Sequence, residues 1–228
     1  MDLSIVIPSY NEEESLPLTI KQITELFHGK KIEYELILVD NGSHDKTAEV
    51  ISLYMKKNPR IKLVTVKKNE GWGNGVIKGS EKASGKFLVY ATADLQTPVD
   101  DIFRIYEVIR NEEDKTIVKV KRDHRGDEFT RYMLSKSYNF LINLLFGFVS
   151  SDVNATPKIM QTFEFRQLEP IYKDYFIDAE LLIKAKKRGF RIIELPTQSV
   201  KRKMGKSNIK IVKDSTSMFM EILKYRFQ

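Results

Sequence analysis

Short apolar runs alternate along the first half of the chain with amphipathic segments of helical length. Runs with the composition of buried strands cover residues 4–7, 35–39, 61–66 and 87–91. The first run is followed by a predicted helix capped by Asn11, with acidic residues 12–14 in its first turn, and further helices are predicted over 45–55, 75–83 and 99–110. This alternation indicates βαβ units and a mostly parallel sheet with both faces covered.

The alternation weakens beyond Asp123. Helical patterns cover residues 129–148, 178–188 and 208–227, and a strand pattern covers 190–195. The sequence contains no internal repeat and no low-complexity linker. We therefore expect one compact α/β domain over residues 1–228, with a Rossmann-like, mostly parallel sheet and helices on both of its faces.

The composition is that of an ordinary globular protein, and its charge narrows the range of partners. Hydrophobic residues make up 42% and charged residues 30% of the chain, and 38 Lys and Arg against 31 Asp and Glu leave a net charge of +7. Such a surplus favours nucleotides, nucleic acid, lipid phosphates or an anionic membrane surface. The absence of cysteine excludes disulfides, cysteine-ligated zinc and a thiol nucleophile.

Two apolar segments bear on the cellular location. Asp2 leads directly into the first predicted strand, with no basic region followed by a longer apolar one, so we expect no secretory signal and a cytoplasmic protein. The longest apolar stretch, 140–149, contains Asn143 and is shorter than the roughly 20 residues of a spanning helix.

Polar or glycine-rich segments follow each of the first four predicted strands, at 8–12, 40–43, 69–75 and 92–96. Each segment also has an ordinary explanation, because Asn-Gly pairs form turns, Asp45 can start a helix and glycine clusters occur in loops. In open parallel sheets, however, ligands bind outside the carboxyl ends of the strands. The convergence of four such segments predicts a ligand site at this edge.

Two of these segments contain residues that could bind a diphosphate or its metal ion. Gly71, Gly73 and Gly75 precede a predicted helix and would let a diphosphate approach the backbone, although an ordinary loop explains them equally well. Asp94 is either a helix cap or a ligand of a divalent metal that bridges two phosphates, since Mg²⁺ needs only one or two carboxylates beside phosphate oxygens and water.

The order of these motifs resembles the family 2 glycosyltransferases of the GT-A fold. The matching segments are 5–12, 38–43 with Asp45 and Thr47, 69–75 and 93–98, followed by Arg122, 131–135, Asp152, 178–182, 189–192, 194–196 and 202–207. The resemblance extends over nearly the whole chain. Within the family, the sequence is most similar to the branch of dolichyl-phosphate mannose synthases and polyprenyl-phosphate glycosyltransferases.

The resemblance implies a donor site and a metal site. The residues expected to bind the nucleotide sugar are Pro8, Tyr10, Glu12, Asp40, Gly71, Asp94 and Lys206. Mg²⁺ or Mn²⁺ is expected on Asp94 and Gln96. Thr92 stands where the family's metal motif has its first aspartate, so we expect weaker metal binding or a greater dependence on the phosphates. Asn41 likewise replaces a frequent second aspartate.

The resemblance also implies an acceptor site. The residues expected around the acceptor phosphate are Arg122, Arg131, Ser135 and Arg202, and the expected catalytic residues are Asp94, Asp152 and Arg202. Segment 152–157 retains only the aspartate of the family's Asp-x-x-Ser-Gly-Phe pattern. If the acceptor is a sugar hydroxyl, a general base is required, and Asp152, with Glu180 behind it, is the candidate.

Two segments leave alternatives open. Residues 201–213 contain six cations and no acid, which suits either a solvated basic face or contacts with phosphates and anionic headgroups. Residues 138–149 suit either ordinary core or an amphipathic helix at the membrane interface.

The expected activity is inverting transfer of a hexose from a nucleotide diphosphate sugar, of the GDP-mannose or UDP-glucose type, to a polyprenyl or dolichyl phosphate. Residues 1–120 would bind the donor and 121–228 the acceptor. A peripheral position at the cytoplasmic face of a membrane, held by the surface or by an anchoring partner, is expected, and nucleic acid is not. The alternatives are transfer to a saccharide hydroxyl and, because of Thr92, a weakly active or inactive nucleotide-binding protein.

Overall fold

The computed structural model describes residues 1–94, 96–123, 129–198 and 211–227. Its strands are β1 (Leu3–Ser9), β2 (Tyr34–Asp40), β3 (Ile61–Thr65), β4 (Phe87–Tyr90), β5 (Thr116–Arg122), β6 (Lys158–Gln161) and β7 (Arg191–Thr197). Its helices are α1 (Leu16–Phe27), α2 (Thr47–Lys57), α3 (Trp72–Ser80), α4 (Asp100–Ile109), α5 (Phe129–Phe146), α6 (Thr162–Leu168), α7 (Ile177–Lys187) and α8 (Ile211–Phe227).

The strands form one sheet in the order β3-β2-β1-β4-β6-β5-β7. Strands β1 to β4 are parallel, and β6 is antiparallel to both of its neighbours, β4 and β5. Because β6 reverses the direction twice, β5 and its parallel partner β7 run in the same sense as β1. All strands except β6 therefore end at one edge of the sheet, and the segment that precedes β6 arrives at that same edge. The predicted α/β, mostly parallel fold is confirmed.

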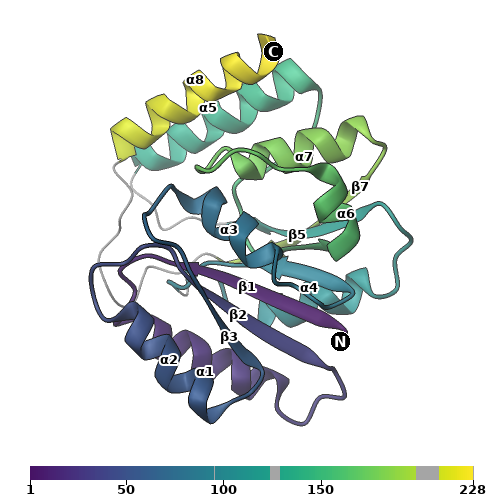
Figure 1. The fold of residues 1–228 in the computed structure, drawn as a ribbon. Helices are drawn as coiled ribbons and strands as arrows, with labels where there is room; N and C mark the ends of the chain where they lie inside the picture. Colours follow the sequence, from purple (N-terminus) through teal and green to yellow (C-terminus); the bar gives the residue numbers. More distant parts are fainter. Residues whose placement is uncertain (95, 124–128, 199–210, 228) are drawn as a thin grey trace.

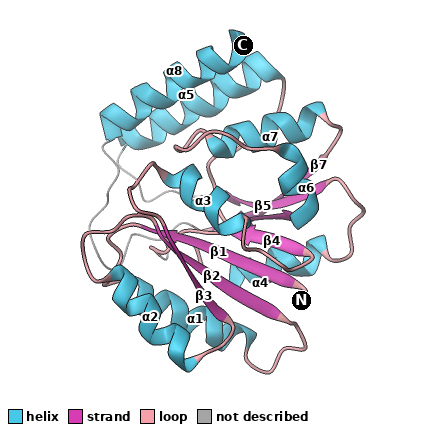
Figure 2. Ribbon diagram, in the orientation of Figure 1, coloured by secondary structure: helices cyan, strands magenta, loops and turns pink. Residues whose placement is uncertain are grey.

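Helices cover both faces of the sheet (Figures 1 and 2). One hydrophobic core joins α1, α2 and α4 to one face, through side chains such as Ile5 of β1. A second core joins α3, α5, α6, α7 and α8 to the other face, through side chains such as Val6. Adjacent residues of β1 thus enter different cores, as the twofold alternation of a strand requires. Strands β1 and β2 are buried along their whole length, which explains their nearly continuous apolar sequences.

Helices α5 and α8 form an outer layer over α7 (Figure 1). The ring of Tyr138 lies 6.0 Å from that of Phe219, and the ring of Phe146 lies 5.8 Å from that of Tyr225. Both pairs advance along the two helices in the same order, so α5 and α8 run parallel. Of the described helices, none combines the length and the apolar character needed to cross a bilayer.

The start of α1 differs from the prediction. The helix begins at Leu16, with Ser15 as its N-cap, and Asn11 adopts a left-handed backbone conformation with φ 53°. The acidic residues 12–14 therefore form a loop instead of a first helical turn. Hydrogen bonds from this loop to the segment after β2 replace those that the helix would have made.

Candidate functional site

Loops from both halves of the chain meet at the carboxyl edge of the sheet. The segments after β1, β2, β4 and β5 reach this edge, as does the segment before β6. The predicted site residues at these strand ends and in these segments are Pro8, Tyr10, Glu12, Asp40, Asp94, Gln96, Arg122 and Asp152. In doubly wound sheets, the crevice between strands whose helical connections leave in opposite directions is the usual ligand site. Here that crevice lies between β1 and β4.

The loops after β1 and β2 are tied together by backbone-to-side-chain hydrogen bonds. The backbone N–H of Asn11 donates to Oγ of Ser43 at 3.1 Å, and the N–H of His44 donates to Oδ1 of Asn11 at 2.9 Å. The N–H of Glu12 donates to Oγ1 of Thr47 at 2.9 Å. The buried carboxylate of Glu12 accepts a bond from Ser15. These bonds hold Glu12 and Tyr10 next to the end of β2.

Asp40 ends β2 with a buried carboxylate. Its Oδ1 accepts the backbone N–H of Ser43 at 3.0 Å. A carboxylate held in this way is suited to accept from a base N–H or a ribose hydroxyl, the chemistry expected of Asp40 in the donor site.

Asn41 supports the adjoining glycine loop. Its Nδ2 donates to the carbonyl of Gly71 at 2.8 Å and to Oδ1 of Asn69 at 3.2 Å, and that same Oδ1 accepts the N–H of Gly71 at 2.8 Å. An ionised aspartate has no proton to donate to the Gly71 carbonyl. The asparagine is therefore explained by its contacts with the loop.

The glycine cluster packs against the segment that precedes α7. A Cβ atom at Gly71, where φ is 114°, would overlap the carbonyl oxygen of Lys173, and one at Gly73 would overlap that of Tyr172. The N–H of Asn74, in the first turn of α3, donates to the Lys173 carbonyl at 2.9 Å. The close backbone approach that these glycines permit is thus to the chain itself, and donor binding by Gly71 stays a prediction.

Asp94 is oriented by its own loop. Oγ1 of Thr92 donates to Oδ1 of Asp94 at 2.8 Å, and the backbone N–H of Gln96 donates to the same oxygen at 3.2 Å. Thr19 of α1 anchors the loop through a 2.8 Å bond to the carbonyl of Ala93. Within the described residues, Oδ2 of Asp94 receives no hydrogen bond, which leaves it available to a ligand.

This donor set fits a divalent metal that is shared with phosphates. The described residues contain no group of three or more His, Cys, Asp or Glu that could hold a metal ion by themselves. Mg²⁺ accepts one or two carboxylates when phosphate oxygens and water complete its octahedron. Asp94, with Thr92 beside it, meets that requirement, and the side-chain contribution of Gln96 stays a prediction.

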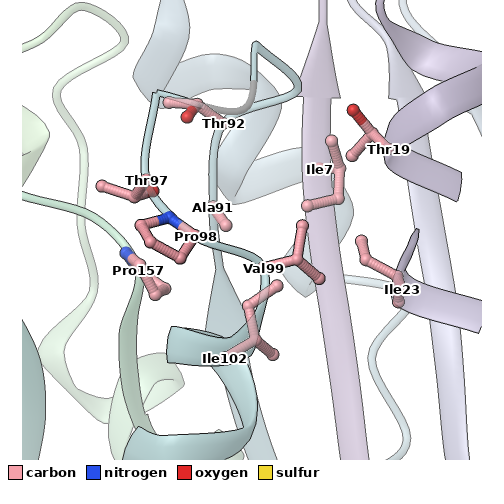
Figure 3. A pocket seen from close by; sticks show the side chains of 10 residues that line it. All are labelled: Ile7, Thr19, Ile23, Ala91, Thr92, Thr97, Pro98, Val99, Ile102 and Pro157. Atoms are coloured by element: carbon pink, nitrogen blue, oxygen red, sulfur yellow. The ribbon is translucent and has the colours of Figure 1, made fainter. Parts of the chain in front are cut away.

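A small pocket beneath this loop shows how the two halves of the chain meet (Figure 3). Thr92 and Pro98 line one part of it, Ile7 at the end of β1 lines another, and Pro157, which precedes β6, completes the wall. Most of its lining residues are apolar, and Ile7 among them belongs to the core under α1 and α4. It places the segment before β6 beside the loop of Asp94.

Arg122 and Asp152 form a bidentate ion pair at this edge. Nε of Arg122 lies 2.8 Å from Oδ2 of Asp152, and Nη2 lies 2.8 Å from Oδ1. The backbone N–H of Arg122 also donates to Oδ2 at 3.2 Å. Both oxygens of the buried carboxylate thus face the arginine. The arginine engages both oxygens of Asp152, and the role of Asp152 as a general base for a hydroxyl acceptor stays a prediction.

Glu180, the second candidate for a base, has a different set of partners. Its buried carboxylate accepts the backbone N–H groups of Ile171 and Tyr172 and pairs with Lys184 at 2.6 Å. These contacts fix the segment that packs on the glycine cluster.

The remaining predicted site residues lie on α5 or beyond β7. Ser135 is half-buried in the second turn of α5. Arg131 belongs to the first turn, but its side chain lies outside the described part of the structure, as do Arg202 and Lys206.

Two buried lysines in this half of the sheet are not among the predicted site residues. Lys119 of β5 and Lys158 of β6 are fully buried and stand opposite each other. Each lysine stands in or beside a short apolar run, at 117–120 and at 158–160. A lysine next to such a run is the sequence signal that could have indicated a buried ammonium group.

Comparison with known proteins agrees with this arrangement. The family model described as glycosyl transferase family 2 matches residues 4–174. The chain is 28% identical over 213 residues to the undecaprenyl-phosphate 4-deoxy-4-formamido-L-arabinose transferase of Photorhabdus laumondii. That alignment covers 92% of this chain and 64% of the relative, so the chain spans somewhat less than two thirds of the relative's length.

Among solved structures, the chain is similar to glucosyl-3-phosphoglycerate synthase from Mycobacterium tuberculosis. A complex of that enzyme with Mn²⁺, uridine diphosphate and phosphoglyceric acid matches with a TM-score of 0.78 and 20% identity, over 99% of this chain and 78% of the other. A complex with Mg²⁺ and uridine diphosphate gives a TM-score of 0.74 and 18% identity, over 99% and 79%. At these identities the likeness shows the fold.

Proposed function

The chain belongs to glycosyl transferase family 2, and from that membership we propose that it moves a hexose from a nucleotide diphosphate sugar to a polyprenyl phosphate. The donor would be of the GDP-mannose or UDP-glucose type, and direct displacement would invert the anomeric centre. The relative from Photorhabdus laumondii, whose name includes undecaprenyl phosphate, supports a lipid phosphate acceptor.

The observation that carries this proposal is the ion pair between Arg122 and Asp152. A phosphate monoester has a second pKa of about 6, so at neutral pH it is already an anionic nucleophile and needs no base. A sugar hydroxyl would need one. Asp152 is held by Arg122 through both carboxylate oxygens, and an arginine oriented in this way suits the binding of a phosphate. The geometry favours a phosphate acceptor over a hydroxyl.

The donor side follows from the loops of β1, β2 and β4. Asp40 and Glu12 would contact the nucleoside, with the diphosphate directed toward Asp94. A divalent ion bound there would supply positive charge to the diphosphate as it leaves. The divalent ions and uridine diphosphate in the complexes of the structurally similar synthase support this arrangement.

The chemical step would proceed at the anomeric carbon. The bond from this carbon to the diphosphate oxygen breaks, an acceptor phosphate oxygen attacks from the opposite side, and the transition state resembles an oxocarbenium ion. Arg122 would hold the acceptor phosphate in line. The loop bonds around Glu12 and Asp40 keep the donor fixed during the displacement.

The outer layer of α5 and α8 supports a position at the membrane. Apolar side chains with exposed fractions from 43% to 84% occur on these helices and just after α5, at Phe140, Leu144, Phe148, Met220, Leu223 and Phe227. Arg226 of α8 is exposed and provides a positive charge beside them, whereas Lys224 pairs with Glu221 at 2.6 Å. Exposed apolar surface with cationic neighbours is typical of helices that lie in the interface of an anionic bilayer. We place this layer against the cytoplasmic face of a membrane.

The test supplies polyprenyl phosphate together with labelled GDP-mannose or UDP-glucose, with and without Mn²⁺, and measures label in the lipid. We expect metal-stimulated transfer from one of the two donors. Parallel reactions offer saccharides and phosphoglycerate as acceptors. Label in those products, with none in the lipid, would contradict a lipid phosphate acceptor. Calorimetry that detects no binding of either nucleotide would contradict the proposal that this protein uses a GDP-mannose or UDP-glucose donor.

A further inference from the structure

Lys119 lies in β5 with its ammonium group fully buried. Its Nζ donates to the carbonyl of Val120 at 2.8 Å and to the carbonyl of Asp152 at 2.6 Å, and it lies 3.4 Å from Oε1 of Glu194. The three acceptors match the three protons of an ammonium group. A buried charge is tolerated only with such partners, so the position of Asp152 and the burial of Lys119 depend on each other.

Glu194 of β7 holds the same loop from a second direction. Its Oε1 accepts the hydroxyl of Ser150 at 2.5 Å and the backbone N–H of Ser151 at 3.1 Å, and its Oε2 accepts the hydroxyl of Ser151. Lys119 and Glu194 therefore contact three consecutive residues, 150–152, which we call the clamp loop.

We propose that Lys119 is a positioning residue, which fixes the clamp loop together with Glu194 so that Asp152 presents Arg122 to the acceptor phosphate. This inference rests on the proposed function of Arg122. The main chain of Asp152 is bound by Lys119, and its side chain is bound by Arg122 at 2.8 Å through each oxygen. Loss of the Lys119 contact would therefore move the carboxylate that orients the arginine.

Lys158 provides a natural comparison. It faces Lys119 across β5 and β6 and is also fully buried, but its ammonium pairs with Asp178 of α7. Asp178 also accepts the hydroxyl of Tyr90 at 3.0 Å. The hydrogen bond and ion pair of Lys158 go to Asp178 and, among the described residues, not to the clamp loop, although the charges of Asp152 and Arg122 influence its pKa. The two lysines therefore share burial and charge but differ in what they hold.

The charges around Lys119 make its contribution depend on pH. Burial and the adjacent charge of Lys158 lower the pKa of Lys119 to about 8, against the opposing effect of Asp152 and Glu194. Of the described residues, these three and Asp178, behind Lys158, are the charged groups that face it. Above this pKa the neutral amine has two protons for three acceptors and no charge to attract Glu194. Acceptor binding should therefore weaken as the pH rises, although the phosphate monoester stays dianionic.

The experiment measures the KM for polyprenyl phosphate and the KM for the nucleotide sugar across this pH range, in the native enzyme and in Lys119→Met. In the native enzyme, we expect the acceptor KM to rise above about pH 8 while the donor KM stays constant. In Lys119→Met, we expect an acceptor KM about tenfold higher at neutral pH, with little further dependence on pH.

Lys158→Met is the matched control, because it removes a neighbouring buried charge and leaves the clamp loop contacts in place. We expect it to lower Tm without raising the acceptor KM. An acceptor KM that is flat with pH in the native enzyme would overturn the inference even if Lys119→Met fails to fold, and so would equal effects of the two variants on the acceptor KM. Absence of lipid product at every pH would instead overturn the proposed function, and this inference with it.

Discussion

Oγ1 of Thr92 donates a 2.8 Å hydrogen bond to Oδ1 of Asp94. The hydroxyl thus stands where the family resemblance places an aspartate, and it orients the remaining carboxylate without adding a second negative charge. The backbone N–H of Gln96 reaches the same oxygen at 3.2 Å. The loop therefore keeps a fixed carboxylate but carries less charge for a divalent metal.

Thr92→Asp should strengthen the use of metal. A second carboxylate beside Asp94 adds a charged ligand, and we expect the Mn²⁺ concentration for half-maximal binding in the presence of nucleotide to fall about tenfold. Calorimetric titration of Mn²⁺ measures this directly. Thr92→Val has a similar size but no hydroxyl, and it should weaken metal binding because Asp94 loses a bond that orients it. Identical metal titrations for all three proteins would show that residue 92 is not next to the metal.

Substitutions of Arg122 and Asp152 should affect the acceptor more than the donor. Arg122→Lys keeps the charge but loses the bidentate geometry, and we expect the KM for polyprenyl phosphate to rise about tenfold. Asp152→Asn should have a similar effect on KM with a smaller change in kcat. Removal of a true general base would instead lower kcat by roughly 10²- to 10⁴-fold. Such a loss in Asp152→Asn, with KM unchanged, would restore Asp152 as the base.

Asn41→Asp should weaken nucleotide binding. The carboxylate would face the Gly71 carbonyl, to which Nδ2 now donates at 2.8 Å, and the glycine loop would move away from Asp40. We expect the Kd for the preferred nucleotide to rise about tenfold, as measured by calorimetry. Asn111→Asp is the control, since Asn111 also donates to a carbonyl, that of Glu107, but is exposed on the surface. Equal effects of both variants would indicate a general effect of charge.

The first four strands could be predicted from the sequence because they are buried nearly throughout or on their core-facing side. Such strands give short apolar runs bounded by turn residues, and the observed ends of β1 and β2 lie within two residues of the predicted ones. Strand β5 was missed because Lys119 and Lys121 interrupt its apolar pattern, and β6 because it has only four residues. The buried lysine is compensated by tertiary contacts that no local pattern contains.

The donor side of the site was predictable for a related reason. Residues that follow parallel strands meet at one edge whatever the details of the loops, so Glu12, Asp40 and Asp94 could be grouped in advance. The position of the clamp loop could not be predicted in the same way. Its contacts with Lys119 and Glu194 depend on the antiparallel insertion of β6, which brings the segment before it to the ends of β5 and β7.

Charged substitutions on the outer layer should release the protein from membranes. Phe140 and Leu144 are 67% and 64% exposed and lie one helical turn apart on α5. If both enter the bilayer interface, Phe140→Glu with Leu144→Glu should lower binding to anionic vesicles at least about tenfold, because each side chain contributes about 1.5–3 kcal/mol of burial. Co-sedimentation measures the bound fraction. Leu53→Glu, at a residue 58% exposed on α2, which covers the other face of the sheet, is the matched control and should bind like the native protein. Equal loss in both proteins would place the lipid-facing surface elsewhere. A native protein that stays in the supernatant would contradict the proposed membrane binding.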